Sequence, residues 1–316
     1  MIRPPDLARL TLAAACWGLG TVISKRAVAE IPPLTLLAIQ LAVSLAVLAL
    51  LMRLRGVSVR AEAPALLGRL GVLNPGAAYA LSLLGLATIS ASVSVTLWAI
   101  EPLLIVLLAG WLLHEQVSRR LILLTIAAVG GMIAVAYDPS GAGTIIGVGL
   151  TLAGVGCCAV YSVIARRWLP EAESTTQVVF VQQAYALGFA LVVALAVLLL
   201  GGGALRVTPS LTAAASAVGS GALYYAGAYW FYLGALRNVP ASRAVVSFYL
   251  IPIVGVASSI ILLGERLQPW QWLGVAIVVG ATLATVGRPE LAASASGAGL
   301  DGLPSRRHED ELADPL

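Results

Sequence analysis

Long apolar runs separated by short, turn-rich breaks dominate the chain. A membrane-spanning helix needs about 20 mostly apolar residues. Proline and glycine clusters such as Pro32-Pro33 and Gly201-Gly202-Gly203 mark breaks between such runs. The pattern predicts an all-α integral membrane protein with ten transmembrane helices, at residues 8–29, 33–52, 67–86, 92–113, 119–137, 144–168, 175–200, 211–235, 241–263 and 269–287.

Composition supports a membrane protein and argues against other classes. Of 316 residues, 59% are hydrophobic and 11% are charged, whereas soluble domains carry about 25% charged residues. The three cysteines all lie in apolar runs, and an odd number does not indicate a disulfide framework. With two histidines in the chain, we expect no metal site.

The distribution of basic residues predicts the orientation. Cytoplasmic loops collect Lys and Arg. A cytoplasmic N-terminus places 15 of the 19 basic residues inside and four outside: Lys25, Arg26, Arg206 and Arg266. An even number of spans then places the C-terminus inside as well. We expect a multi-pass protein of the bacterial inner membrane, with residues 288–316 as a disordered cytoplasmic tail. Run 8–29 is interpreted as the first span rather than as a cleaved signal peptide.

The chain contains an internal repeat. A shift of 150 residues aligns 87–137 with 237–287 without a gap, and 12 of the 51 positions are identical. The informative identities are Pro102/Pro252, Glu115/Glu265 and Gly130/Gly280. A shift of 142 aligns the first spans of the two halves and pairs Cys16 with Cys158. We predict one five-helix repeat at 8–137 and a second at 144–287, inverted because five is an odd number.

The repeated motifs resemble a known domain. They read Ala91-Ser92, Glu101-Pro102 and Leu112-Leu113-His114-Glu115 in the first half, and Ala241-Ser242, Ile251-Pro252 and Leu262-Leu263-Gly264-Glu265 in the second. This pattern is similar to the EamA domain of the drug/metabolite transporter superfamily. The resemblance implies ten helices, cytoplasmic termini and export or exchange of small metabolites, in some bacterial members aromatic amino acids. His114 and Ala159 depart from the family pattern.

Transport is the function that these features favour. The sequence contains no Gly-x-x-x-x-Gly-Lys phosphate loop, catalytic triad or paired carboxylates. We therefore expect a secondary transporter rather than an enzyme, with no cofactor. Its expected partners are a small-molecule substrate and membrane lipid, without nucleic acid, in a monomer or weak homo-oligomer. A multidrug or nucleotide-sugar carrier is the alternative within transport. A polytopic membrane enzyme or scaffold is the alternative outside it.

An aromatic face on the eighth predicted span gives the first candidate binding residues. Tyr225, Tyr229 and Tyr232 have i, i+4, i+7 spacing. Their repeat equivalents on the third span include Tyr79 and Ser82. Tyrosine hydroxyls at membrane depth need a hydrogen-bond partner, so we predict a wettable aromatic cavity. The alternative is an interfacial aromatic belt or helix packing.

The fourth predicted span adds Trp98 and Glu101 to the candidate site. An acidic residue inside an apolar span is a functional hypothesis. Glu101 could carry a proton, balance a cationic group on the substrate, or have a structural role beside Pro102. Lys25 could extend to the surface or attract a substrate carboxylate. The intramembrane glutamines could line the path or bond neighbouring helices: Gln40, Gln177, Gln182 and Gln183.

Overall fold

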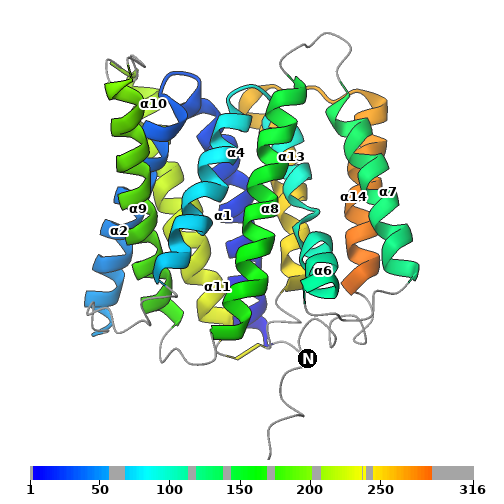
Figure 1. Ribbon diagram of the computed structural model, residues 1–316, viewed down its shortest axis with the longest axis horizontal. Coiled ribbons are helices and arrows are strands. Elements are labelled where there is room, and N and C mark those ends of the chain that lie inside the picture. Colours follow the sequence, from blue (N-terminus) through cyan, green and yellow to red (C-terminus); the bar gives the residue numbers. More distant parts are fainter. Residues whose placement is uncertain are drawn as a thin grey trace, which may run out of the picture.

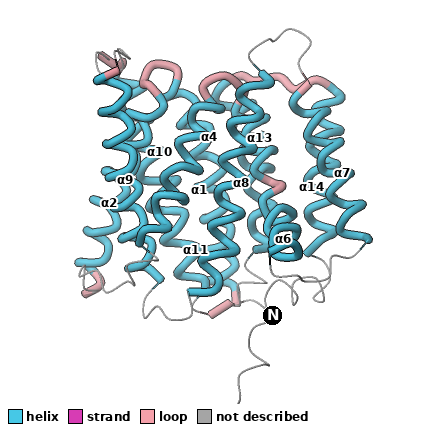
Figure 2. The backbone as a smooth tube through the Cα atoms, viewed as in Figure 1, coloured by secondary structure: helices cyan, strands magenta, loops and turns pink. Residues whose placement is uncertain are grey.

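The structure is a bundle of helices standing side by side (Figures 1 and 2). It is a computed structural model that describes residues 3–56, 68–112, 119–137, 144–168, 175–200, 208–236, 238–239 and 245–286. Within these ranges there is no strand. In chain order the elements are α1 (Pro4–Val28), α2 (Pro33–Leu54), η1 (Leu70–Val72), η2 (Leu73–Ala77), α4 (Ala78–Leu86), α5 (Ala91–Trp98), α6 (Glu101–Leu112), α7 (Arg119–Ala136), α8 (Thr144–Trp168), α9 (Thr175–Leu199), α10 (Leu211–Ser220), η4 (Gly221–Gly227), α11 (Ala228–Leu236), η5 (Val245–Tyr249), α13 (Leu250–Leu263) and α14 (Pro269–Val286).

The outer surface of the bundle is apolar. Large hydrophobic side chains point away from the helices on several sides, among them Leu123, Ile126, Ile133, Ile145, Val192 and Ile261. In a soluble protein such a surface would cause association. Four described helices are long and apolar enough to cross a membrane: α1, α2, most of α8 and most of α9. Five further apolar helices are shorter. An apolar outer surface and helices of this length are features of a membrane protein.

Several of the predicted spans are divided. The third and eighth contain π-helical segments, η2 and η4, in place of continuous α-helix. The fourth and ninth are each two elements, α5 with α6 and η5 with α13. Pro102 and Pro252 stand near the starts of α6 and α13, and a proline cannot donate the backbone hydrogen bond to the preceding turn. Each interruption therefore recurs in both halves of the chain.

The helix packing is also reciprocal between the halves. Helix α1 packs on α13 and on α10, η4 and α11, whereas α8 packs on α5 and α6 and on α4. These are equivalent partners under the repeat. Helix α2 packs on α9, and α7 on α14, at opposite ends of the view in Figure 1. Exchanging the two halves leaves this packing arrangement unchanged.

The first helices of the two halves run in opposite directions. Lys25, near the end of α1, donates from Nζ to the carbonyl oxygen of Leu86 at the end of α4, 2.8 Å away. Gly147, near the start of α8, packs against Gly85 of α4, so that an added Cβ would lie 3.1 Å from the Gly85 oxygen. Helix α8 therefore begins where α1 ends (Figure 1). We call the end where α1 starts the N-terminal face, and the other end the opposite face.

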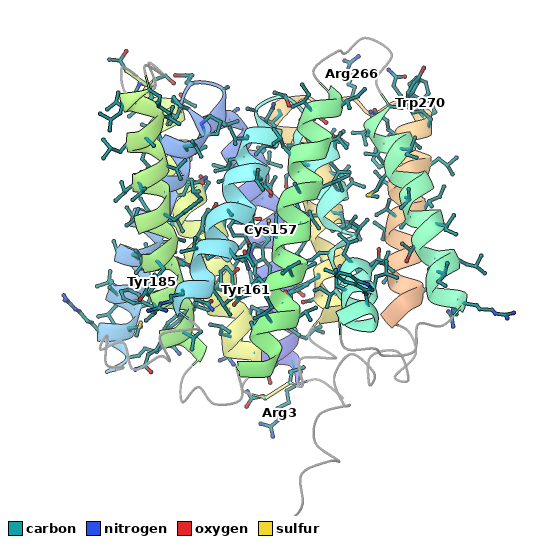
Figure 3. All side chains as sticks on the ribbon, in the orientation of Figure 1. Arg3, Cys157, Tyr161, Tyr185, Arg266 and Trp270 are labelled. Atoms are coloured by element: carbon teal, nitrogen blue, oxygen red, sulfur yellow. The ribbon has the colours of Figure 1, made fainter. Side chains whose placement is uncertain are left out.

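Charged and aromatic residues mark the two ends of the bundle. Arg3 lies at the N-terminal face, whereas Arg266 and Trp270 lie at the opposite face (Figure 3). Between the ends, polar side chains are buried and bonded to one another. Gln40 Nε2 donates to Ser24 Oγ at 2.9 Å and to Ser220 Oγ at 2.7 Å. These bonds join α2 to α1 and α10, as membrane helices require of their buried polar groups.

Candidate functional site

A cavity of about 330 Å³ lies between the two halves of the bundle. Among the described residues, nine aromatic side chains line it: Trp17, Tyr79, Trp98, Tyr161, Tyr224, Tyr229, Tyr232, Phe248 and Tyr249. Its polar lining consists mainly of Thr21, Asn74, Glu101, Cys158, Ser162 and Gln182. Pockets for small organic ligands are mostly apolar, with a few placed polar groups and volumes of about 300–1,000 Å³. The cavity meets this description.

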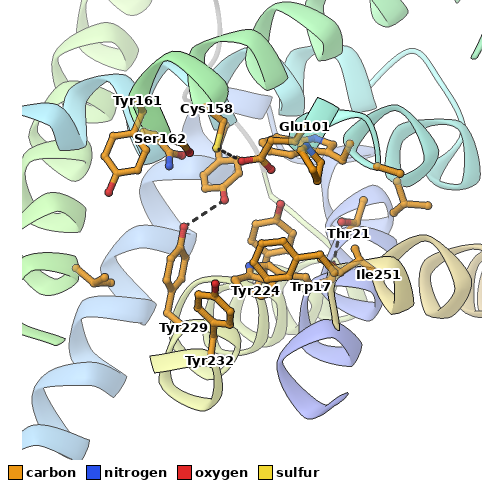
Figure 4. A pocket seen from close by; sticks show the side chains of 18 of the residues that line it. Trp17, Thr21, Glu101, Cys158, Tyr161, Ser162, Tyr224, Tyr229, Tyr232 and Ile251 are labelled. Atoms are coloured by element: carbon orange, nitrogen blue, oxygen red, sulfur yellow. Dashed lines mark hydrogen bonds between the residues drawn. The ribbon is translucent and has the colours of Figure 1, made fainter. Parts of the chain in front are cut away.

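The cavity extends from the middle of the bundle toward the N-terminal face. Its walls include Ser162 near the end of α8, Val178 near the start of α9, Leu233 near the end of α11, and Phe248 just before α13. All four positions lie in the half of the bundle nearer that face. The central part of the lining comes from Trp17, Tyr224 and Tyr229 and their neighbours (Figure 4).

Contacts at the opposite face join the helices above the cavity. Arg26 donates to the carbonyl oxygen of Leu262 at 3.2 Å. Glu265, which follows α13, accepts hydrogen bonds from the backbone N–H of Ala91 at 2.7 Å and of Ser92 at 3.0 Å. The Ser92 hydroxyl donates to the same carboxylate at 2.6 Å. A carboxylate at a helix N-terminus is favoured by the exposed N–H groups and by the helix dipole.

The aromatic lining is a connected set of rings. Trp17 contacts Tyr229, Tyr232 and Phe248 edge-to-face, with centroids 5.2–5.7 Å apart. Tyr79 lies 5.4 Å from both Trp98 and Tyr224, centroid to centroid. Such pairs add about 0.5–1.5 kcal/mol beyond the area they bury. The rings therefore hold one another in place around the open volume.

Five of the seven predicted binding residues line this cavity: Tyr79, Trp98, Glu101, Tyr229 and Tyr232. Ser82 and Tyr225 do not, and instead border a smaller space of about 20 Å³ beside it. The i, i+4, i+7 spacing assumes an uninterrupted α-helix, whereas Tyr224 and Tyr225 lie in η4. The wider turn directs Tyr224 into the cavity and leaves Tyr225 buried against Tyr79, with ring centroids 5.2 Å apart.

Glu101 stands on the cavity wall at the start of α6. The Cys158 thiol on α8 donates to its Oε1 at 3.1 Å (Figure 4). This contact connects the first half of the chain with the second across the cavity. For the described residues, the hydrogen bond found at the Glu101 carboxylate comes from α8 and does not bridge the backbone beside Pro102.

Other polar candidates divide between lining and packing positions. Gln182 lines the cavity and accepts a hydrogen bond from the Tyr161 hydroxyl at 2.9 Å. Gln183 faces α2, where the Ser44 hydroxyl donates to it, and its amide donates to the carbonyl oxygen of Tyr225 at 2.9 Å. Lys25 lies at the opposite face on Leu86, outside the cavity lining. His114 and Glu115 lie outside the described residues.

Sequence reasoning left several lining residues out of the predicted site. Phe248 and Tyr249 are equivalent to Trp98 and Ala99 under the shift of 150 residues. Applying the repeat to Trp98 would have identified Phe248. Tyr161 carried no comparable signal, because it stands alone near the end of an apolar run.

The comparisons with known proteins agree with this architecture. The EamA-like transporter family matches the chain over residues 8–137 and 145–287. A solved crystal structure of a protein superposes with a TM-score of 0.63 at 20% sequence identity, covering 93% of this chain and 97% of that chain. At this identity the likeness concerns the fold. No curated protein matches the chain significantly.

Proposed function

The chain belongs to the EamA-like transporter family, and we propose that it is a secondary transporter that exports or exchanges a small organic solute. Amino acids, in particular aromatic ones, or related metabolites are the proposed substrates. The proposed architecture is ten transmembrane helices in two inverted five-helix repeats, in the bacterial inner membrane with both termini in the cytoplasm.

The observation that carries this proposal is the cavity at the interface of the two halves. Repeat-equivalent residues line it in pairs, namely Tyr79 with Tyr229, Trp98 with Phe248 and Pro102 with Pro252. Transporters built from inverted repeats place the substrate near the membrane midplane between the repeats. The opposite directions of α1 and α8 support the same arrangement.

Alternating access is the proposed mechanism. The cavity extends toward the N-terminal face, whereas Arg26 and Glu265 bind across helix ends at the opposite face. If the N-terminal face is cytoplasmic, this arrangement corresponds to an inward-facing state. Rocking of one repeat against the other would then separate the contacts at the opposite face and expose the same rings to the other side.

The lining favours an aromatic or partly apolar solute over a nucleotide sugar. Aromatic rings supply most of the wall, and no Lys or Arg is among the described lining residues. A phosphate-bearing ligand needs donors such as Arg, Lys or backbone N–H groups to compensate its charge. These features place the nucleotide-sugar alternative behind a metabolite carrier.

Uptake by proteoliposomes tests the proposal. Purified protein is reconstituted into vesicles, and entry of a panel of radiolabelled amino acids and their amine derivatives is compared with protein-free vesicles. We expect saturable entry of aromatic members and acceleration by the same unlabelled solute on the far side. Entry no faster than into protein-free vesicles, for every solute and with folded protein, would contradict the proposal.

A further inference from the structure

The described part of the cavity wall has an acidic side chain but no basic one. Of the described residues that line the cavity, Glu101 alone has an acidic or basic side chain. Two basic side chains of the described residues bind elsewhere: Lys25 donates to Leu86 at the opposite face, and Arg9 forms an ion pair with Asp6 at 3.1 Å near the N-terminal face. Among the described lining residues, a ligand anion would therefore meet no basic side chain, whereas a ligand cation would meet a carboxylate.

The aromatic rings around Glu101 add a second attraction for a cation. Tyr79, Trp98 and Tyr224 form one cluster on the wall, and Tyr229 and Tyr232 continue it toward the N-terminal face. Ring faces attract ammonium groups placed within about 6 Å of the centroid, and proteins that recognise quaternary ammonium ligands use cages of such rings. A cage of this kind with one carboxylate matches an ammonium group attached to an apolar body.

Glu101 retains the capacity to accept a ligand donor. The Cys158 thiol binds Oε1 at 3.1 Å, and an ionised carboxylate offers about four acceptor sites. A thiol is a weak donor, so an ammonium N–H can compete with it or bind beside it. The carboxylate belongs to the first half and the thiol to the second, so a ligand at this point touches both repeats.

We propose that the solute is an organic ammonium ion, an aromatic or apolar amine, whose cationic head binds the Glu101 carboxylate while its body lies among Tyr79, Trp98, Tyr224 and Tyr229. This inference rests on the proposed function and, among the proposed solutes, favours amine metabolites over the amino acids themselves. A zwitterionic amino acid with the same side chain binds more weakly, because its carboxylate finds no basic partner among the described residues of the wall. When an amine and an amino acid carry the same ring, the amine, bound as its ammonium ion, is therefore the preferred ligand.

Binding to purified full-length protein tests the charge preference. Isothermal titration compares four probes with the same ring: phenethylamine as cation, phenylalanine as zwitterion, 2-phenylethanol as neutral molecule and 3-phenylpropionate as anion. We expect phenethylamine to bind most tightly, about tenfold or more above the neutral probe, since a hydrogen bond to a charged group is worth more than a neutral one. Tightest binding of the anion, the zwitterion or the neutral probe would overturn the proposal, as would folded protein that binds none of them.

A pair of variants then locates the charge effect. Glu101→Gln is expected to weaken phenethylamine binding about tenfold or more while leaving 2-phenylethanol nearly unchanged. Glu30→Gln removes the same charge in the loop after α1, outside the cavity lining, and should leave both affinities unchanged. Equal affinity of the Glu101→Gln variant and the parent for phenethylamine would overturn the assignment. If the Glu101→Gln variant does not fold, the order of affinities of the four probes for the parent protein still tests the proposed charge preference.

Transport separates this inference from the function on which it rests. If phenethylamine binds through Glu101 but no solute of the panel enters vesicles faster than into protein-free ones, the transporter is contradicted and the ammonium site stands. Saturable entry of neutral or anionic solutes in preference to phenethylamine would support the transporter and contradict the ammonium site.

Discussion

The hydroxyl oxygens of Tyr79 and Tyr229 lie 3.4 Å apart, although the two residues are separated by 150 positions in the chain. They are equivalent residues of the two repeats, so this contact lies where the two halves meet. Both rings line the cavity. The contact therefore joins the repeats at the point where we place the solute.

Removing one of these rings should weaken solute binding. Tyr229→Ala deletes a ring that packs edge-to-face on Trp17 at 5.5 Å. Stacking contributes about 0.5–1.5 kcal/mol per ring pair, and about 1.4 kcal/mol corresponds to a factor of ten. Together with the lost contact area, we expect affinity for the transported solute to fall several-fold or more, measured by titration. Tyr229→Phe should cost less, because the ring remains.

Tyr185→Ala is the matched control for the ring. Tyr185 lies on α9, is 41% exposed and does not line the cavity. The Tyr185→Ala variant should therefore bind the solute with the affinity of the parent protein. If Tyr79→Ala and Tyr229→Ala both fold and bind as the parent does, the rings serve packing alone. The solute site must then be sought around Trp98, Glu101 and Gln182.

The sequence pattern predicted the helical elements well because long apolar runs and proline breaks are local signals. The repeat pairs Tyr79 with Tyr229, and the contact between their hydroxyls agrees with that pairing. Side-chain direction in the eighth span was harder to foresee. Periodicity counts residues per turn, and a π-helical segment such as η4 changes that count. For this reason Tyr224 lines the cavity, whereas Tyr225 packs beside it.

Contacts between distant loops were also beyond prediction. Glu265 belongs to a repeated sequence motif, and its partners Ala91 and Ser92 precede it by more than 170 residues. The sequence motifs contain both Ala91-Ser92 and Glu265, but the spacing of these residues does not indicate which helix N-terminus the Glu265 carboxylate contacts. Only the packing of α13 on α5 brings them together.

Membrane orientation is tested by cysteine labelling. The basic residues predict that Ser305 is cytoplasmic and that the loop carrying Arg266 is external. In a variant without the three native cysteines, Ser305→Cys should resist a membrane-impermeant maleimide in intact spheroplasts and react after permeabilisation. Gln268→Cys, in the loop between α13 and α14, should react before permeabilisation. The reverse pattern would show that the chain is oriented the other way.

The loop after α1 predicts a pH dependence of stability. The Ser210 backbone N–H and hydroxyl donate to the Glu30 carboxylate, each at 2.8 Å. These two hydrogen bonds, the backbone bond first, lower the pKa of Glu30. A group whose pKa is lower in the folded state stabilises the fold above its unfolded pKa, about 4.3 for Glu. That contribution is lost as the pH falls through the folded pKa.

Comparing melting temperatures of the parent and Glu30→Gln from pH 7 to pH 3 measures this contribution. We expect a small difference in favour of the parent that stays constant down to about pH 5 and shrinks below it. Ser210→Ala should lower the melting temperature at neutral pH and reduce the pH-dependent part without abolishing it, because the backbone N–H of residue 210 still donates to Glu30. A difference that does not change with pH would exclude this hydrogen-bonded carboxylate as its source.

Glu265 should control opening at the opposite face. Its carboxylate accepts three hydrogen bonds from Ala91 and Ser92 at the start of α5. Hydrogen bonds to a charged group contribute about 1.5–3 kcal/mol each in favourable settings. The carboxylate therefore holds α13 and α5 together at the face we expect to be external. Weakening it should favour conformations that are open there.

Accessibility of Thr21 measures this opening. Thr21 lies on α1 and lines the cavity. In a variant without native cysteines, Thr21→Cys should react slowly with an impermeant thiol reagent applied from outside. Adding Glu265→Gln replaces the carboxylate with a neutral amide, which accepts through one oxygen only. This change should raise the rate about tenfold, since a shift of about 1.4 kcal/mol changes a population tenfold. Arg266→Gln changes the neighbouring charge but none of these bonds, and should leave the rate near that of Thr21→Cys alone. Equal rates with and without Glu265→Gln, in protein that remains folded by gel filtration, would mean that this carboxylate supports the helix end without governing access.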